Sequence, residues 1–95
     1  MLTSKDRAAL RKIANSLETI LQVGKGGISE QVVKQADDAL EAREIIKGKV
    51  LENAPAFARE VAEELASATN SEVVQVIGTK FVLYRKNKKN PKITF

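Results

Sequence analysis

Hydrophobic residues recur along this chain at two spacings, which predict that helices and strands alternate. From Leu10 to Leu17 the apolar positions lie three or four residues apart, which is the spacing of one face of an α-helix. Thr3 or Ser4 can cap this helix, and Asp6 falls in its first turn. We therefore expect the chain to begin with an amphipathic helix.

The next residues predict a short strand and a second helix. Residues 19–23 are rich in β-forming side chains and stop at a run of glycines. Ser29 can then cap a helix whose inner stripe continues to Leu40. Ile28 before this cap and Val33 after it have the spacing of a hydrophobic staple, which fixes how a chain enters a helix.

A second strand and a third helix follow. Residues 44–51 are apolar but too short between breakers to form a helix, so they predict a strand, and Gly48 within it indicates a bulge or a close approach of another group. Pro55 suits the opening of a helix that ends near Asn70. Phe57 falls on the apolar side of this helix, and we expect it in the core.

Two β-rich runs, residues 73–77 and 80–85, are separated by Gly78-Thr79, a loop suited to a type II′ hairpin turn. The element order α-β-α-β-α-β-β predicts an α/β domain (α+β, two-layer) with a four-stranded mixed sheet. In it the β-α-β units run parallel and the last hairpin adds one antiparallel strand. We expect one domain over residues 1–95, with residues 86–95 as a basic C-terminal tail.

Composition excludes most catalytic chemistry. The 95 residues include no cysteine and no histidine, which removes disulfides, common metal ligands and thiol or imidazole catalysis. We expect no cofactor, no metal and no enzymatic activity. The longest unbroken hydrophobic run is the four residues from Phe81 to Tyr84, far below the span of a membrane, so we expect a soluble, cytoplasmic protein without membrane contact.

Charge is segregated along the chain. Residues 1–25 carry a net charge of +3, residues 26–72 carry −5 and residues 73–95 carry +6. A local field of one sign matters more to a polyanion than the total charge does. The lysines of the tail either form a solvated end or join a basic surface, and the pattern alone leaves both open.

Three of the five glycines lie within Gly24-Lys25-Gly26-Gly27, between the first strand and the second helix. The segment lacks the Lys-Ser/Thr of an ATP-binding loop, and Ser29 occupies the third glycine position of a dinucleotide fingerprint. Two interpretations remain: a tight turn, or a Gly-x-x-Gly loop that grips a nucleic-acid backbone with its amides and Lys25.

Other side chains give weaker signals. Phe57 and Phe81 fall at core positions, which leaves Tyr84 and Phe95 as candidates for stacking on bases, although packing is the favoured role for Tyr84. Acidic residues of the second and third helices could in principle hold Mg²⁺, but a solvated helix face explains them better. They are Asp37, Asp38, Glu41, Glu60, Glu63 and Glu64.

Several of these segments, taken in order, resemble one known family. They are Leu10-Arg11-Lys12 with Ala14-Asn15, Gln22 to Ser29 around the glycine loop, Glu44-Ile45-Ile46-Lys47, Val74 to Gly78 and Val82 to Arg85. Together they resemble the single-domain YhbY-type proteins of the CRM group, the chloroplast RNA splicing and ribosome maturation domain. The chain departs from the family where Asn15 stands for histidine and Glu18-Thr19 for Lys-Pro.

The resemblance implies a fold similar to the C-terminal domain of initiation factor three, with the helices on one side of the sheet. It also implies a bacterial RNA-binding protein that acts in ribosome biogenesis on precursors of the large subunit, through the Gly-x-x-Gly loop. We expect a monomer that binds large-subunit rRNA and that can meet a ribosomal protein through its acidic helices. The candidate RNA contacts are Gly24, Lys25, Gly26, Gly27, Arg7, Arg11, Lys12, Lys47 and Arg85.

Two other functions remain open from the sequence. Folds of this class also occur in chromatin proteins, so the protein could bind double-stranded DNA, and competition between duplex DNA and structured RNA separates the two ligands. The acidic helices could instead make the protein an adaptor between other proteins, in which case its binding would resist nuclease. Nucleic-acid binding, by contrast, should weaken steeply as salt rises.

Overall fold

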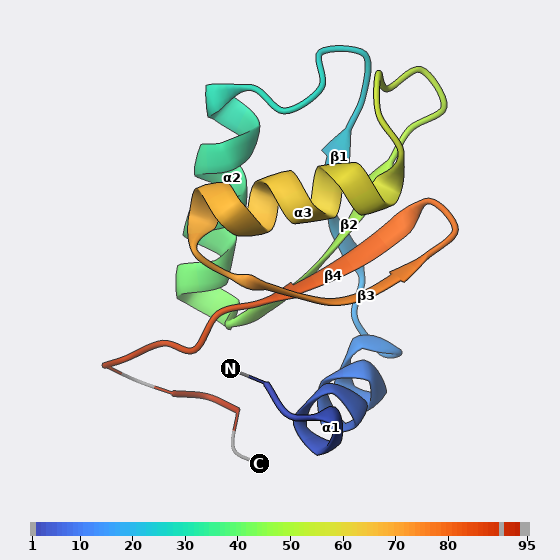
Figure 1. The fold of residues 1–95 in the computed structure, drawn as a ribbon. Helices are drawn as coiled ribbons and strands as arrows, with labels where there is room; N and C mark the ends of the chain where they lie inside the picture. The colour runs from blue at the N-terminus through green and yellow to red at the C-terminus, as the bar shows by residue number, and fades with distance from the viewer. Residues whose placement is uncertain (1, 90, 94–95) are drawn as a thin grey trace.

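A computed structural model describes residues 2–89 and 91–93 and confirms the predicted order of elements (Figure 1). Three helices alternate with the first strands, and a hairpin closes the sheet. The elements are α1 (Ser4–Ala14), β1 (Thr19–Val23), α2 (Glu30–Arg43), β2 (Ile45–Val50), α3 (Ala58–Thr69), β3 (Glu72–Ile77) and β4 (Lys80–Tyr84).

The strands form one mixed sheet in the order β1-β2-β4-β3. β1 is parallel to β2, and β4 is antiparallel to both β2 and β3, so β4 is the one antiparallel strand, as predicted. It lies between β2 and β3 instead of at an edge. The tight β3–β4 turn, in which Gly78 has a φ of 60°, makes β4 the direct neighbour of β3, and pairing with β2 on its other side places it inside the sheet.

Helices cover both faces of the sheet, where the resemblance had implied one. α2 and α3 pack on one face over a core that includes Leu40, Leu65 and Phe81. α1 packs on the opposite face, where Leu10 and Ala14 meet β2, β3 and β4 (Figure 1). α1 carries its own apolar stripe, and the side chains of β2 and β4 alternate between the two faces, so each face has a core.

The predicted helix caps are present for the first two helices. Thr3 and Asp6 form a capping box at the start of α1, and the hydroxyl of Ser29 accepts a hydrogen bond of 3.2 Å from the amide of Val32. The prediction for Phe57 was wrong. Phe57 is the N-cap residue of α3, gives no side-chain capping bond, and is 81% exposed. The apolar side of α3 begins one residue later, at Ala58.

Gly48 is required by a close approach, one of the two predicted explanations. It pairs with Phe81 across β2 and β4, and a Cβ at Gly48 would lie 2.3 Å from Cζ of the Phe81 ring. The ring is fully buried and fills the space over the glycine. A larger side chain at position 48 would have to displace this ring.

The tail returns to the end of α2 through the carboxylate of Glu44. Glu44 is fully buried and accepts hydrogen bonds from the amides of Asn87 (2.8 Å), Lys92 and Ile93 (2.8 Å). Burial alone would raise the pKa of Glu44, but these amide donors and the charge of Lys92 hold it below its ordinary value of 4.5. Phe95, a predicted stacking candidate, lies outside the described residues.

Candidate nucleic-acid interface

The glycine loop, residues Gly24 to Gly27, forms a tight turn between β1 and α2. The amide of Gly27 donates a 2.9 Å hydrogen bond to the carbonyl of Gly24, which closes the turn. The loop stands at one end of the sheet, beside the segment that joins β2 to α3 (Figure 1). The tip, Lys25 and Gly26, is exposed, and neither amide donates to an acceptor on another described residue.

The three glycines of the loop differ in how far the fold requires them. Gly27 has a φ of +65°, and a Cβ there would lie 3.1 Å from Pro55. A Cβ at Gly24 would lie 3.3 Å from Leu51. Gly26 has neither a positive φ nor any atom within 4 Å of a Cβ. The fold therefore explains Gly24 and Gly27 but not Gly26, whose missing side chain leaves room at the surface.

A second basic feature lies on the sheet face that α1 covers only in part. Strand register places Gln22 beside Lys49, Lys49 beside Lys80, and Lys80 beside Ile77. Lys47 lies on this same face, two residues before Lys49. We call this the open sheet face, made of Gln22, Lys47, Lys49, Gln75, Ile77 and Lys80.

Lys49 and Lys80 were not among the candidates drawn from the sequence. They stand directly opposite each other on β2 and β4, and like charges in that position destabilise a sheet. An anion bound over the pair would relieve this repulsion. The alternation of Lys47 and Lys49 around Gly48 could have indicated a shared face, but only the register brings Lys80 to it.

The candidates on α1 divide into two groups. Arg11 and Lys12 are exposed in its last turn, and the ammonium of Lys47 lies 3.4 Å from the carbonyl of Ala14, so all three basic residues lie near the end of this helix. Arg7 is half-buried, and its Nη1 donates a 2.5 Å hydrogen bond to the carbonyl of Val73. This bond ties α1 to β3.

Arg85 lies apart from the other candidates. Its side chain is 19% exposed and pairs with Asp37 at 2.6 Å and with Glu41 at 3.3 Å, so α2 neutralises its charge. It also donates to the carbonyl of Thr69 at the end of α3. Arg85 therefore joins α2 and α3 to the end of β4, on the acidic side of the domain.

Tyr84 is no longer a stacking candidate. It is 4% exposed and packs in the core under α1, which was the ordinary role considered for it. Burial raises the pKa of Tyr84, and the charges of Glu44, Asp6 and Glu72 add to the effect. The ring therefore offers no exposed face to a base.

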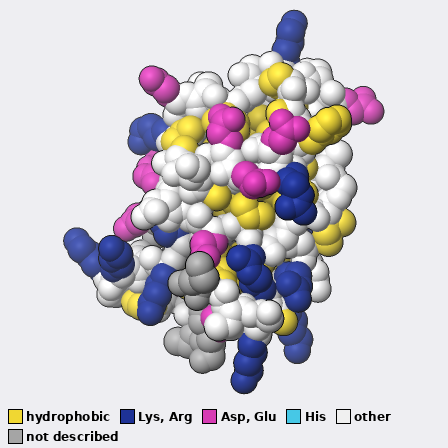
Figure 2. Space-filling model, in the orientation of Figure 1, with side chains coloured by type: hydrophobic (Ala, Val, Ile, Leu, Met, Phe, Trp, Pro, Cys, Tyr) yellow, Lys and Arg dark blue, Asp and Glu magenta, His cyan; other side chains and the backbone are white. Residues whose placement is uncertain are grey.

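Acidic side chains spread over the face formed by α2 and α3, whereas lysine and arginine side chains gather below, around α1 and the tail (Figure 2). Among residues 2–89 and 91–93, no group of three or more histidine, cysteine or acidic side chains is arranged to hold a metal ion. None of the helices in the described part of the chain is long and apolar enough to span a membrane.

Comparison with known families gives one match across most of the chain. The model of the CRS1 / YhbY (CRM) domain matches residues 2–85. The chain belongs to this family. The CRM domain therefore includes all seven helices and strands and the glycine loop, and the matched region ends where the tail begins.

Relatives of this CRM domain carry names that refer to RNA. The probable RNA-binding protein YqeI of Bacillus subtilis is 46% identical over 93 residues, covering 98% of this chain and 97% of its own length. The probable RNA-binding protein PA4753 of Pseudomonas aeruginosa is 32% identical, covering 93% of this chain and 85% of its own. The solution structure of SAV1595 from Staphylococcus aureus, described as a candidate RNA binder, is 50% identical with a TM-score of 0.82, covering 99% and 98% of the two chains.

Proposed function

We propose that this CRM domain binds RNA without catalysis, through the glycine loop and the basic surface that continues from it. The observation that carries the proposal is Gly26, the loop glycine that the fold itself does not require. A residue without a side chain at an exposed tip lets a phosphate approach the backbone amides of the loop. Lys25 beside it adds a mobile positive charge.

Basic residues outside the loop, on the side of the sheet that carries α1, would supply most of the affinity. Arg11, Lys12 and Lys47 lie near the end of α1, and Lys49 and Lys80 extend the positive charge over the open sheet face. Each phosphate neutralised by such residues releases counterions, so affinity should fall steeply as salt rises. Contacts of this kind set the position of the RNA but do not read its sequence.

Arg7 and Arg85 fill different places in this proposal. Arg7 uses its Nη1 atom to bond to β3, but its guanidinium has other nitrogens, and it lies on the same helix as Arg11. We therefore place Arg7 at the margin of the interface. Arg85 is paired with two carboxylates on the opposite side, and we assign it to the stability of the fold. The acidic face of α2 and α3 would repel RNA and so restrict binding to the other side.

The names of the relatives favour RNA over duplex DNA as the ligand. The family resemblance further supports a ribosome-assembly factor in the cytoplasm that acts, as a monomer, on rRNA of the large-subunit precursor. A ribosomal protein, commonly basic, could meet the acidic face of α2 and α3 in the same particle.

Sedimentation of a cell lysate tests this function. We expect the tagged protein to sediment with, or just below, the large ribosomal subunit in a sucrose gradient. The double change Lys25→Asp, Gly26→Asp should move it to the top of the gradient, because the loop would then repel phosphate. A matched control is Lys34→Asp, Gln35→Asp, which makes the same change in net charge on exposed positions of α2 and should sediment like the original protein.

The other outcomes separate the alternatives. Signal only at the top of the gradient at low salt would contradict the ribosomal role. Sedimentation that survives nuclease treatment, or that both double variants lose equally, would contradict binding through the loop and favour a protein partner. Stronger competition by duplex DNA than by structured RNA of equal length would overturn the choice of RNA.

A further inference from the structure

We infer that Phe57 forms a stacking site for an unpaired nucleobase, beside the loop that holds the phosphate. This inference rests on the proposed RNA binding and specifies which part of the RNA the protein recognises. It begins from the exposed ring. Phe57 is 81% exposed, whereas Phe81 and Tyr84 are buried.

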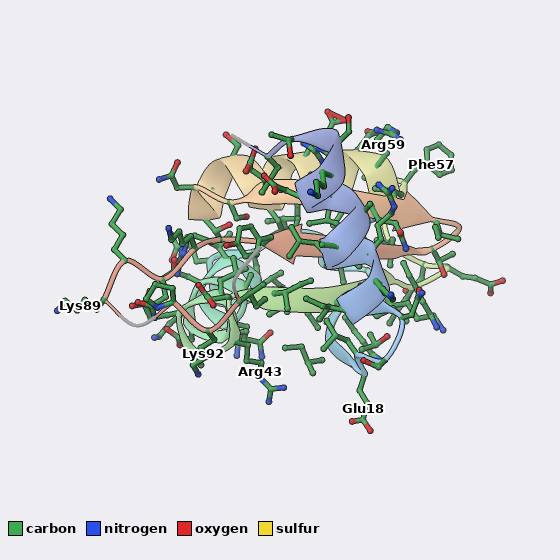
Figure 3. The ribbon with its side chains drawn as sticks, turned by 90° about the horizontal axis from the view of Figure 1, so that it is seen from below. Glu18, Arg43, Phe57, Arg59, Lys89 and Lys92 are labelled. Carbon is green, nitrogen blue, oxygen red and sulfur yellow. The ribbon has the colours of Figure 1, made fainter. Side chains whose placement is uncertain are left out.

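Neither helix stability nor packing explains a phenylalanine at this position. The residue at a helix N-cap is ordinarily Ser, Thr, Asp or Asn, because its side chain accepts a hydrogen bond from the first turn. Phe57 occupies this position in α3 without any such bond. Its ring also gains little from burial, and Figure 3 shows it projecting from the corner of the domain where α3 begins, with Arg59 nearby.

The ring borders a hollow of about 510 Å³ between the start of α3, the segment after β2 and the β3–β4 hairpin. The hollow is lined mainly by apolar groups, among them Leu51, Ala54, Pro55 and Val76. An apolar hollow beside an exposed aromatic ring suits a nucleobase, which stacks on an aromatic face whatever its identity.

Two side chains, Leu51 and Pro55, lie between the hollow and the glycine loop. Leu51 and Pro55 line the hollow, and they are also the groups that a Cβ at Gly24 or Gly27 would meet, at 3.3 and 3.1 Å. A nucleotide whose phosphate contacts the loop would therefore have its base, or that of its neighbour, within reach of Phe57. This adjacency is the reason to assign the hollow to a base.

The charges at the rim agree with a base and disagree with a phosphate. Glu52, Arg59 and Glu60 line the hollow, and because the two carboxylates outnumber the one guanidinium, the rim on balance repels an anion. A nucleobase is uncharged at neutral pH, and its amino groups can donate hydrogen bonds to a carboxylate. The phosphate thus belongs at Lys25 and the loop amides, and the base belongs at Phe57.

A tryptophan reporter tests the site directly. The chain contains no tryptophan, so Phe57→Trp introduces a single fluorophore at the proposed site. We expect a single-stranded RNA oligonucleotide to quench its fluorescence by stacking, and an abasic oligonucleotide with the same number of phosphates to bind with little quenching. Ala68→Trp, at an exposed position near the other end of α3, is the control and should be unaffected.

Affinity gives a second readout. Phe57→Leu keeps an apolar side chain but removes the aromatic face, and stacking is worth about 1–3 kcal/mol per base. We expect the affinity for single-stranded RNA to fall by about 5-fold or more, the affinity for duplex RNA to stay the same, and Phe57→Tyr to bind like the original protein. The circular dichroism spectrum should not change, because the ring is exposed.

Different failures identify different errors. If the original protein binds RNA, and Lys25→Asp, Gly26→Asp abolishes this binding while Phe57→Leu leaves it unchanged, the stacking site is wrong and the proposed function stands. If abasic RNA quenches Phe57→Trp as strongly as intact RNA, the hollow does not hold a base. If the original protein does not bind RNA at all, the proposed function fails first.

Discussion

At the scale of single residues, the sequence located the glycine loop but could not show what each glycine does. Gly24, Gly26 and Gly27 look alike in a sequence, and only the backbone angles and neighbouring atoms separate them. The same limit applies to Phe57. Its spacing from Val61 is that of a core position, but exposure depends on where the helix begins relative to the sheet.

Substitutions of two loop glycines should therefore have opposite effects. Gly26→Ala should keep the free energy of unfolding or raise it by up to about 1 kcal/mol, because alanine restricts the unfolded chain. It should nonetheless weaken RNA binding, because a methyl group stands where the phosphate approaches. Gly27→Ala should lower the free energy of unfolding by about 1–2 kcal/mol, because its φ is +65°.

Urea unfolding and RNA binding, measured on the same preparations, check this pair. If Gly26→Ala is destabilised like Gly27→Ala, then the fold does require Gly26. If it binds RNA with unchanged affinity, the close approach of phosphate to the loop is contradicted.

At the scale of elements, the hydrophobic pattern predicted all seven helices and strands, because each has a distinct period and a stop signal at its end. It did not predict the position of β4 inside the sheet, the place of α1 on the opposite face or the docking of the tail on Glu44. These depend on contacts between segments far apart in the sequence. A single acidic residue at the end of a helix carries no sign that it will be buried.

The tail contact predicts how stability depends on pH. The native pKa of Glu44 is lowered, so its contribution is present above the ordinary value of 4.5 and is lost as the pH falls through the native value. Glu44→Gln removes the charge and one acceptor oxygen. At pH 7 it should lower the free energy of unfolding by about 1.5–3 kcal/mol, which is typical of a hydrogen bond to a charged group.

Urea unfolding of the original protein and of Glu44→Gln, measured from pH 7 to pH 3, provides the test. The difference between the two should shrink as the pH drops below 4.5, because protonation turns the carboxylate into a neutral group. A difference that stays constant over this range would show that the charge of Glu44 does not hold the tail.

At the scale of the whole molecule, charges that are separated along the sequence are also separated in space: acidic side chains lie over α2 and α3, and basic side chains lie around α1 and the tail (Figure 2). Strand register adds Lys49 and Lys80 on the open sheet face. The net charges of the three segments anticipated this division. They could not assign Arg85, which lies in a basic segment but pairs with acidic residues of α2. Arg85 follows β4 in the sequence, but its side chain lies beside α2.

Mapping the amide signals of isotope-labelled protein by NMR during a titration with RNA tests the central claim most directly. We predict that the largest shifts occur at Lys25 and Gly26, followed by Lys49 and Lys80 on the open sheet face, with little change over the exposed parts of α2 and of α3 beyond its first turn. Shifts confined to α2 and α3, or an absence of shifts in the glycine loop when RNA is bound, would contradict the account.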